Sequence, residues 1–278
     1  MKFAIYVPNF GAFGDARVLA KLASDAENAG WDGFFIWDHV LWSAPIEQPV
    51  VEPWVALTAI AMATERIKIA PIITPLPRRR PWQVARQAAS VDELSGGRLI
   101  LGFGIGFDGY GDYSAFDEPA DSKIHGEMLD EGLTIVDGLL SGDPFAFEGK
   151  HYRIKQTQFL PKPPQQPRIP IWVAGLWPGT KPFRRAAKWD GIAPLRKGPN
   201  DPLEPQDYRD MVAYINRYRE GNNQAFDLIG PSDKWRPTQE ELLSYEEAGV
   251  TWWKVGFGPS HTPEEVSREI KLGPGPKT

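Results

Sequence analysis

The chain contains no cysteine. Disulfides, thiolate nucleophiles and sulfur-ligated metal sites are therefore excluded. No apolar run approaches the roughly 20 residues needed to span a bilayer. The N-terminal stretch MKFAIYVPNFG has neither the long apolar region nor the small-residue cleavage site of a signal peptide. We expect a cytoplasmic protein with no membrane partner.

Positive charge is not in excess, because 31 Lys and Arg face 36 Asp and Glu, for a net charge of −5. A nucleic-acid partner requires a basic surface, so we expect none. Histidine is scarce as well. His125, His151 and His261 form no metal-ligand spacing with one another or with nearby carboxylates, and we assign no metal.

The most informative stretch is residues 80–106, RPWQVARQAASVDELSGGRLILGFGIG. Apolar residues recur at helical spacing over Pro81–Ser95, and the pair of glycines that follows is a typical helix stop. Leu99–Phe103 is almost continuously apolar, which predicts a strand buried on both faces of a parallel sheet. From the end of this strand onward, every second residue is a glycine without a side chain, so a flat ligand or another backbone segment can approach closely. These positions are Gly102, Gly104 and Gly106.

As a whole, the string resembles the luciferase-like oxidoreductase family, whose members are barrel enzymes that use FMN or the deazaflavin F420. In that family a helix of this type ends in SGGR and runs into a strand of the LGxGxG type. The resemblance extends over nearly the whole chain. It implies a flavin-type cofactor at the top of a barrel.

Strand and helix patterns alternate along the 278 residues, a length that suits one (β/α)8 TIM barrel of about 250 residues. We expect a single α/β domain over residues 1–278 with a β-hairpin inserted at about 143–167. The predicted strands are Lys2–Val7, Trp31–Trp37, Ile67–Ile73, Leu99–Phe103, Ile171–Ala174, Gly191–Leu195, Phe226–Ile229 and Thr251–Val255. The predicted helices are Asp15–Ala29, Pro53–Ala63, Pro81–Ser95, Ile124–Leu140, Phe183–Trp189, Asp207–Glu220, Gln239–Ala248 and Pro263–Lys271.

Active sites of such barrels lie at the C-terminal ends of the strands, which places Asp38 and His39 at a candidate site. A histidine there can bond a cofactor or substrate and exchange a proton near neutral pH, although a structural histidine is equally compatible with the sequence. The resemblance favours the catalytic role, because many F420-dependent members carry a similar Asp-His pair. Asp38 suits an orienting role better than that of a base. Trp37 and Trp42 either line the pocket of the cofactor ring or pack in the core.

The end of the third strand, PIITP, resembles the family's bulge with a non-prolyl cis peptide that supports the cofactor ring. The pattern implies a cis bond between Pro71 and Ile72 and a cofactor contact from Pro71. The predicted ring pocket is formed by Ile72, Thr74, Gly104 and Gly106. The arginines that follow, residues 78–80, either bind an anionic cofactor tail or form a solvated loop.

After the fifth strand, the stretch AGLWPGT offers glycines and a helix N-terminus, whose free N–H groups can bind an anion. It resembles the family's phosphate-binding loop. We therefore predict cofactor contacts from Ala174, Gly175, Gly179 and Thr180, in addition to Gly104 and Gly106.

These residues predict an oxidoreductase, expected to be a homodimer, that transfers hydride between F420 and a small organic substrate. The alternatives are an FMN-dependent monooxygenase, a catalytically silent flavin-binding protein, and a barrel enzyme with metal or Schiff-base chemistry. Lys254 is the lysine that the last alternative would use. The sequence does not identify the substrate.

Overall fold

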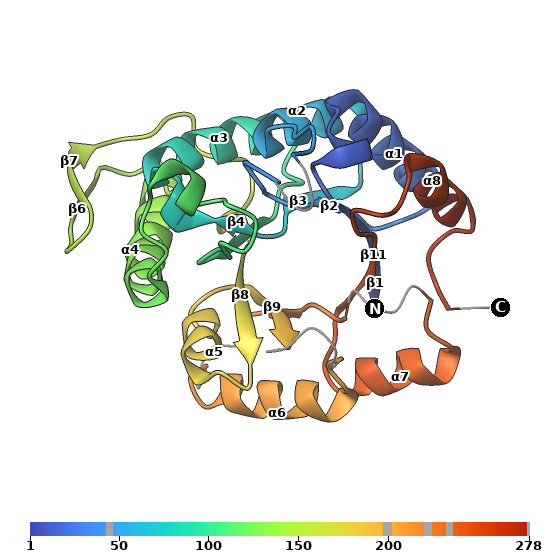
Figure 1. Cartoon of the computed structure of the whole chain (residues 1–278). Coiled ribbons are helices and arrows are strands. Elements are labelled where there is room, and N and C mark those ends of the chain that lie inside the picture. Colours follow the sequence, from blue (N-terminus) through green and yellow to red (C-terminus); the bar gives the residue numbers. More distant parts are fainter. Residues whose placement is uncertain (43–46, 197–201, 220–223, 232–235, 277–278) are drawn as a thin grey trace.

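The computed structural model describes residues 1–42, 47–196, 202–219, 224–231 and 236–276. Within them, parallel strands alternate with helices as the sequence predicts (Figure 1). The barrel strands are β1 (Lys2–Val7), β2 (Gly33–Ile36), β3 (Lys68–Pro71), β5 (Leu101–Gly104), β8 (Ile171–Trp177), β9 (Gly191–Arg196), β10 (Asp227–Leu228) and β11 (Trp252–Gly256).

Two parallel sheets make up the barrel, in the orders β11-β1-β2-β3 and β10-β9-β8-β5-β4, where β4 is Thr74–Pro75. Single parallel bridges join their edges. Ile69 of β3 pairs with Leu99, which precedes β5, and Ile229, which follows β10, pairs with Trp252 of β11. The predicted (β/α)8 barrel is thus confirmed.

The interior of the barrel is filled by aromatic side chains. Phe35, Trp172 and Trp252 contact one another with ring centroids 5.3–5.7 Å apart, and each is at most 1% exposed. Side chains along a strand alternate between its two faces, so residues two and four positions beyond these rings point toward the C-terminal mouth of the barrel. This aromatic layer closes the barrel from below and leaves the mouth as the open end.

The helices surround the strands (Figure 1). In the figure α1, α2 and α3 lie on one side of the barrel and α5, α6 and α7 on the opposite side. Their bounds are α1 Ala16–Asn28, α2 Pro53–Ala63, α3 Pro81–Leu94, α4 Ser122–Leu140, α5 Thr180–Ala186, α6 Pro205–Asn216, α7 Gln239–Glu247 and α8 Pro263–Lys271. The helix predicted to end at Glu220 ends at Asn216, and Glu220 itself lies outside the described residues.

The predicted hairpin is present as β6 (Phe145–Glu148) and β7 (Arg153–Thr157), and it projects beyond α4 (Figure 1). The Glu131 carboxylate on α4 accepts backbone N–H groups from Lys150, His151 and Tyr152 at 2.8–3.3 Å. One carboxylate therefore holds the turn of the hairpin against the helix.

The fifth predicted strand is longer than expected. It continues to Trp177, because Leu176 and Trp177 pair with Leu195 and Arg196 of β9. The next helix begins at Thr180 instead of Phe183. Most of the predicted phosphate loop is therefore strand, and only Pro178 and Gly179 connect it to α5.

Candidate functional site

His39 follows β2 at the C-terminal mouth of the barrel, and its backbone is fixed by Asn9. The buried Asn9 amide donates to the carbonyl oxygens of His39 and Val51, both at 2.8 Å. The His39 N–H donates to the Asn9 side-chain oxygen at 3.1 Å. The position of the histidine is thus set by the segment that follows β1.

The His39 ring contacts an acid from another loop. Its Nδ1 atom lies 2.5 Å from Oδ2 of Asp112, and 18% of the His39 side chain is exposed. No described residue hydrogen-bonds the second ring nitrogen, Nε2. That atom remains available to a bound molecule.

Aromatic rings enclose His39. Phe10, Trp42 and Tyr110 form a continuous stack with centroid separations of 3.9 and 3.8 Å, and the edge of the stack meets His39. Trp37 lies 5.9 Å from the His39 ring. Of the two predicted tryptophans, Trp42 thus packs in the stack and Trp37 lies beside it, and together these rings limit the access of water to His39.

Behind His39 lies a buried cluster of charges. Arg78, in the short helix η2 (Leu76–Arg78), forms ion pairs with Asp38 and with Oδ1 of Asp112, the latter at 2.8 Å. Arg79 pairs with Asp38 at 2.9 Å and with Glu52 at 3.0 Å. The Asp38 carboxylate is fully buried. These two arginines are therefore neither free for a cofactor tail nor solvated, in contrast to both sequence-based alternatives.

Thr74 also binds Asp38, because its hydroxyl donates a hydrogen bond to Oδ2 at 2.7 Å. Both oxygens of Asp38 thus have protein partners. This geometry suits the orienting role predicted for Asp38, and the cofactor contact predicted for Thr74 stays a prediction.

Asp112 carries a negative charge at neutral pH. Burial of this carboxyl opposes ionisation, but the hydrogen bond with His39 and the charge of Arg78 outweigh it and lower the pKa of Asp112. The Val40 N–H also donates to its Oδ1 atom, at 2.9 Å. Arg78 and Val40 thus bind one oxygen of Asp112, and His39 binds the other.

The bulge after β3 is present, with the cis peptide one residue later than predicted. It joins Ile72 to Ile73, because Pro71 still pairs with Ile36 in the regular β2–β3 ladder. The Tyr6 hydroxyl donates to the Ile72 carbonyl at 2.6 Å. Burial raises the pKa of Tyr6, so this hydroxyl stays protonated and able to donate.

The alternate glycines lie against this bulge. A Cβ atom at Gly102 would lie 2.5 Å from the Pro71 carbonyl oxygen, and one at Gly104 would lie 2.8 Å from Ile73 and 3.2 Å from Ala174. The sequence analysis expected either a flat ligand or another backbone segment close to these glycines. At Gly102 the structure shows a backbone segment. Gly104, Ala174 and the bulge meet at one point of the mouth.

Gly106 has a different environment. Its φ of +80° is the left-handed region that favours glycine, and a Cβ atom there would lie 2.7 Å from the Tyr113 hydroxyl and 2.9 Å from Pro75. Both the backbone conformation and the packing therefore require glycine at this position.

The predicted phosphate-binding residues are divided between two faces. Ala174 and Leu176 lie on the same face of β8 as the interior Trp172, whereas a Cβ at Gly175 would meet Pro182 and Phe183 on the outside. The Gly179 N–H donates to the Leu176 carbonyl at 2.8 Å. Thr180 begins α5.

Apolar surface is exposed at the mouth. Leu176 and Leu195 pair across β8 and β9 and are 49% and 50% exposed, while their strands are buried below them. By alternation from Trp172 and Ala193, both side chains face the barrel axis. Lys254 lies deeper, 3% exposed, with Nζ 4.9 Å from the centre of the Tyr6 ring. The mouth thus combines a polar side, around His39, with an apolar side.

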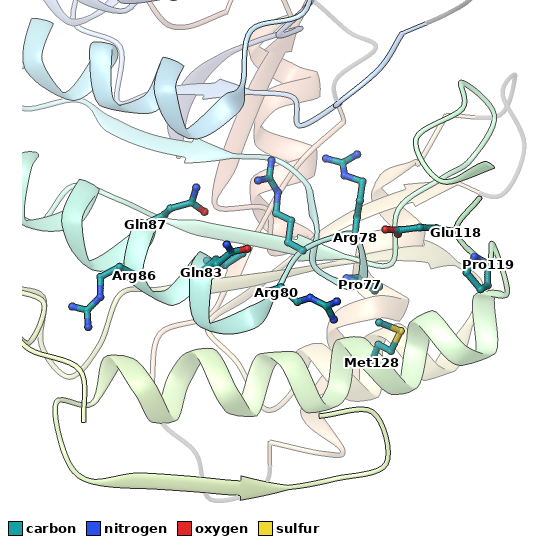
Figure 2. A pocket seen from close by; sticks show the side chains of 11 residues that line it. Pro77, Arg78, Arg80, Gln83, Arg86, Gln87, Glu118, Pro119 and Met128 are labelled. Atoms are coloured by element: carbon teal, nitrogen blue, oxygen red, sulfur yellow. The ribbon is translucent and has the colours of Figure 1, made fainter. Parts of the chain in front are cut away.

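A separate pocket of about 680 Å³ lies between α3 and α4 (Figure 2). Its walls come from η2, the first two turns of α3, the segment before α4 and Met128 of α4. Arg78 and Arg79 line it, but none of the predicted cofactor residues does. It is therefore distinct from the barrel mouth.

The sequence analysis missed Asp112 and Asn9. Asp112 lies six residues beyond Gly106 in a glycine-containing loop after β5. An acid in a loop after a barrel strand is a weak indication of a site residue, and this indication could have found Asp112. Asn9 had no signal. Among the described residues no cluster of His, Asp or Glu could hold a metal, and none of the described helices is long and apolar enough to cross a membrane.

Comparison with known proteins gives concordant results. Residues 1–221 match the family described as luciferase-like monooxygenase. The uncharacterized protein Rv0940c of Mycobacterium tuberculosis is 31% identical over 273 residues, covering 90% of this chain and 88% of its own. The coenzyme F420-dependent tetrahydromethanopterin reductase of Methanopyrus kandleri superposes with a TM-score of 0.76 at 17% identity, covering 98% of this chain and 96% of its own. Monooxygenase RslO1 of Streptomyces bottropensis superposes with a TM-score of 0.74 at 18% identity, covering 98% and 97%. The chain belongs to the luciferase-like family.

Proposed function

We propose that this protein is an oxidoreductase that transfers hydride between F420 and a small organic substrate at the barrel mouth. The observation that carries this proposal is His39, a histidine held by Asn9 at the end of β2 with a ring nitrogen that no described residue binds. The bound deazaflavin would supply the hydride chemistry. His39 would exchange a proton with the substrate oxygen at Nε2.

The mouth suits a flat ring system. Small residues at Gly104 and Ala174 and the bulge at Ile72 and Ile73 form one side, and the exposed Leu176 and Leu195 form an apolar side that a ring would cover. We assign the ring pocket to these residues. The stretch from the end of β8 to the start of α5, with the turn at Pro178 and Gly179 and with Thr180 as first helical residue, is our candidate for the phosphate of the cofactor.

An FMN-dependent monooxygenase is the second candidate. The match to luciferase-like monooxygenases and the likeness to RslO1 favour it. The Asp38-His39 pair favours F420, because the family resemblance associates this pair with F420-dependent members.

Side-by-side titration of the purified protein with F420 and with FMN tests the choice. We expect F420 to bind at least about tenfold more tightly, a difference of about 1.4 kcal/mol that one or two hydrogen bonds can supply. Equal affinities or tighter binding of FMN would contradict the F420 assignment. Tight binding of either cofactor by a protein that turns over no alcohol, aldehyde or ketone and consumes no oxygen would favour the silent binding protein.

A further inference from the structure

Asp112 contacts the ring of His39, although the two residues are 73 positions apart in the sequence. Asp112 reaches the site from the loop after β5, whereas His39 follows β2. We propose that Asp112 is a positioning residue that fixes the tautomer of His39, so that Nδ1 carries the hydrogen and Nε2 is the atom that exchanges protons. This inference rests on the proposed function for its consequence in turnover, but not for the tautomer itself.

The two oxygens of Asp112 have different partners. Oδ1 accepts the Val40 N–H at 2.9 Å and lies 2.8 Å from Nη1 of Arg78 in an ion pair. Oδ2 lies 2.5 Å from Nδ1 of His39. An ionised carboxylate only accepts hydrogen bonds, so Nδ1 must be the donor in this contact.

The charge of Asp112 is maintained by its surroundings. Its side chain is 2% exposed, and Arg78 beside it is 7% exposed, so water screens their attraction very little. Arg78 in turn is shared with Asp38. Asp112 therefore presents a fixed, negatively charged acceptor to the histidine.

An asparagine at position 112 would reverse the contact. Val40 and Arg78 are both donors, so they would hold the amide oxygen of Asn at the place of Oδ1. The amide NH2 would then face Nδ1 of His39 and donate to it. The hydrogen of the neutral ring would move to Nε2, which would leave no acceptor nitrogen at the mouth.

The test measures the tautomer directly by nitrogen-15 NMR of the imidazole rings in the cofactor-free protein at about pH 8.5, above the ordinary range of histidine titration. The His39→Asn variant assigns the signals of His39 among the four histidines. In the parent we expect hydrogen on Nδ1. Hydrogen on Nε2 in the parent would overturn the proposal without any variant.

Asp112→Asn should shift the hydrogen to Nε2 and lower kcat by more than about 100-fold with little change in KM. Asp108→Asn is the matched control, because Asp108 lies in the same loop and accepts hydrogen bonds from Tyr113 and Ser114 instead of contacting His39. We expect it to leave the tautomer and kcat unchanged. An unchanged tautomer in Asp112→Asn, or an inverted tautomer with parental kcat, would overturn the role of Asp112. Failure of the parent to bind either cofactor would instead count against the proposed function.

Discussion

Replacing Arg78 by methionine should destabilise the fold, because it leaves two buried carboxylates without their shared cation. Arg78 pairs with both Asp38 and Asp112, and its side chain is 7% exposed. Removing one partner of a buried ion pair costs about 3–5 kcal/mol. For 278 residues the unfolding entropy is about 0.6 kcal/mol/K, at roughly 2.1 cal/mol/K per residue. The expected fall in Tm is therefore about 5–9 °C.

The loss should depend on pH. In the parent, the pKa of Asp112 is lowered, so its contribution to stability is present above the unfolded pKa of about 3.9 and is lost as the pH falls through the folded value. In Arg78→Met the charge of Arg78 is gone, so the pKa of Asp112 lies higher than in the parent and this contribution to stability is smaller. The Tm difference between parent and variant should thus be larger at about pH 7.5 than at about pH 3.

Thermal unfolding followed by circular dichroism at both pH values measures this difference. Arg80→Met is the control, because the exposed Arg80 guanidinium lies 6.0 Å from the Trp82 ring and has no buried acid beside it among the described residues. Its Tm should change by less than about 1 °C, as for surface substitutions within about 0.5 kcal/mol. A Tm loss in Arg78→Met no larger than that of the control, or one independent of pH, would refute the account of Arg78 as the cation that both carboxylates require.

Two further substitutions test the site. His39→Asn should leave Tm within a few degrees of the parent while turnover falls by about 100-fold or more, as for loss of a positioned acid or base; turnover within about threefold would make His39 structural. Gly106→Val should lower Tm, because the positive φ costs about 1–3 kcal/mol and the new side chain meets Tyr113 and Pro75. If Gly106 also lies against the cofactor, the affinity per folded molecule, measured by fluorescence titration of the same sample, should fall as well, and parental affinity would remove Gly106 from the site.

The sequence predicted the barrel because the apolar patterns of its strands and helices are local. Pro81 and the glycine pair at 96 and 97 bound α3 almost where expected, since caps act within one turn. The predicted end of β8 was wrong because its last three residues are strand only through pairing with β9. That pairing is a long-range interaction, which no local pattern encodes.

The candidate site was only half predictable for the same reason. His39 and Asp38 follow a strand and could be placed at the mouth, but their partners come from other loops. Asp112 and Arg78 are of residue types that usually lie on the protein surface, and only the fold brings them together in a buried cluster. A run of three arginines predicts solvent exposure or anion binding, and nothing local indicates that two internal acids neutralise the first two.

The contact between His39 and Asp112 joins two loops without involving any strand. Each loop can therefore vary in length and sequence while the hydrogen bonding of the barrel stays intact. A designer who wishes to retune the reactivity of the histidine could graft a different loop after β5, provided that the new loop keeps an acid beside the buried Arg78.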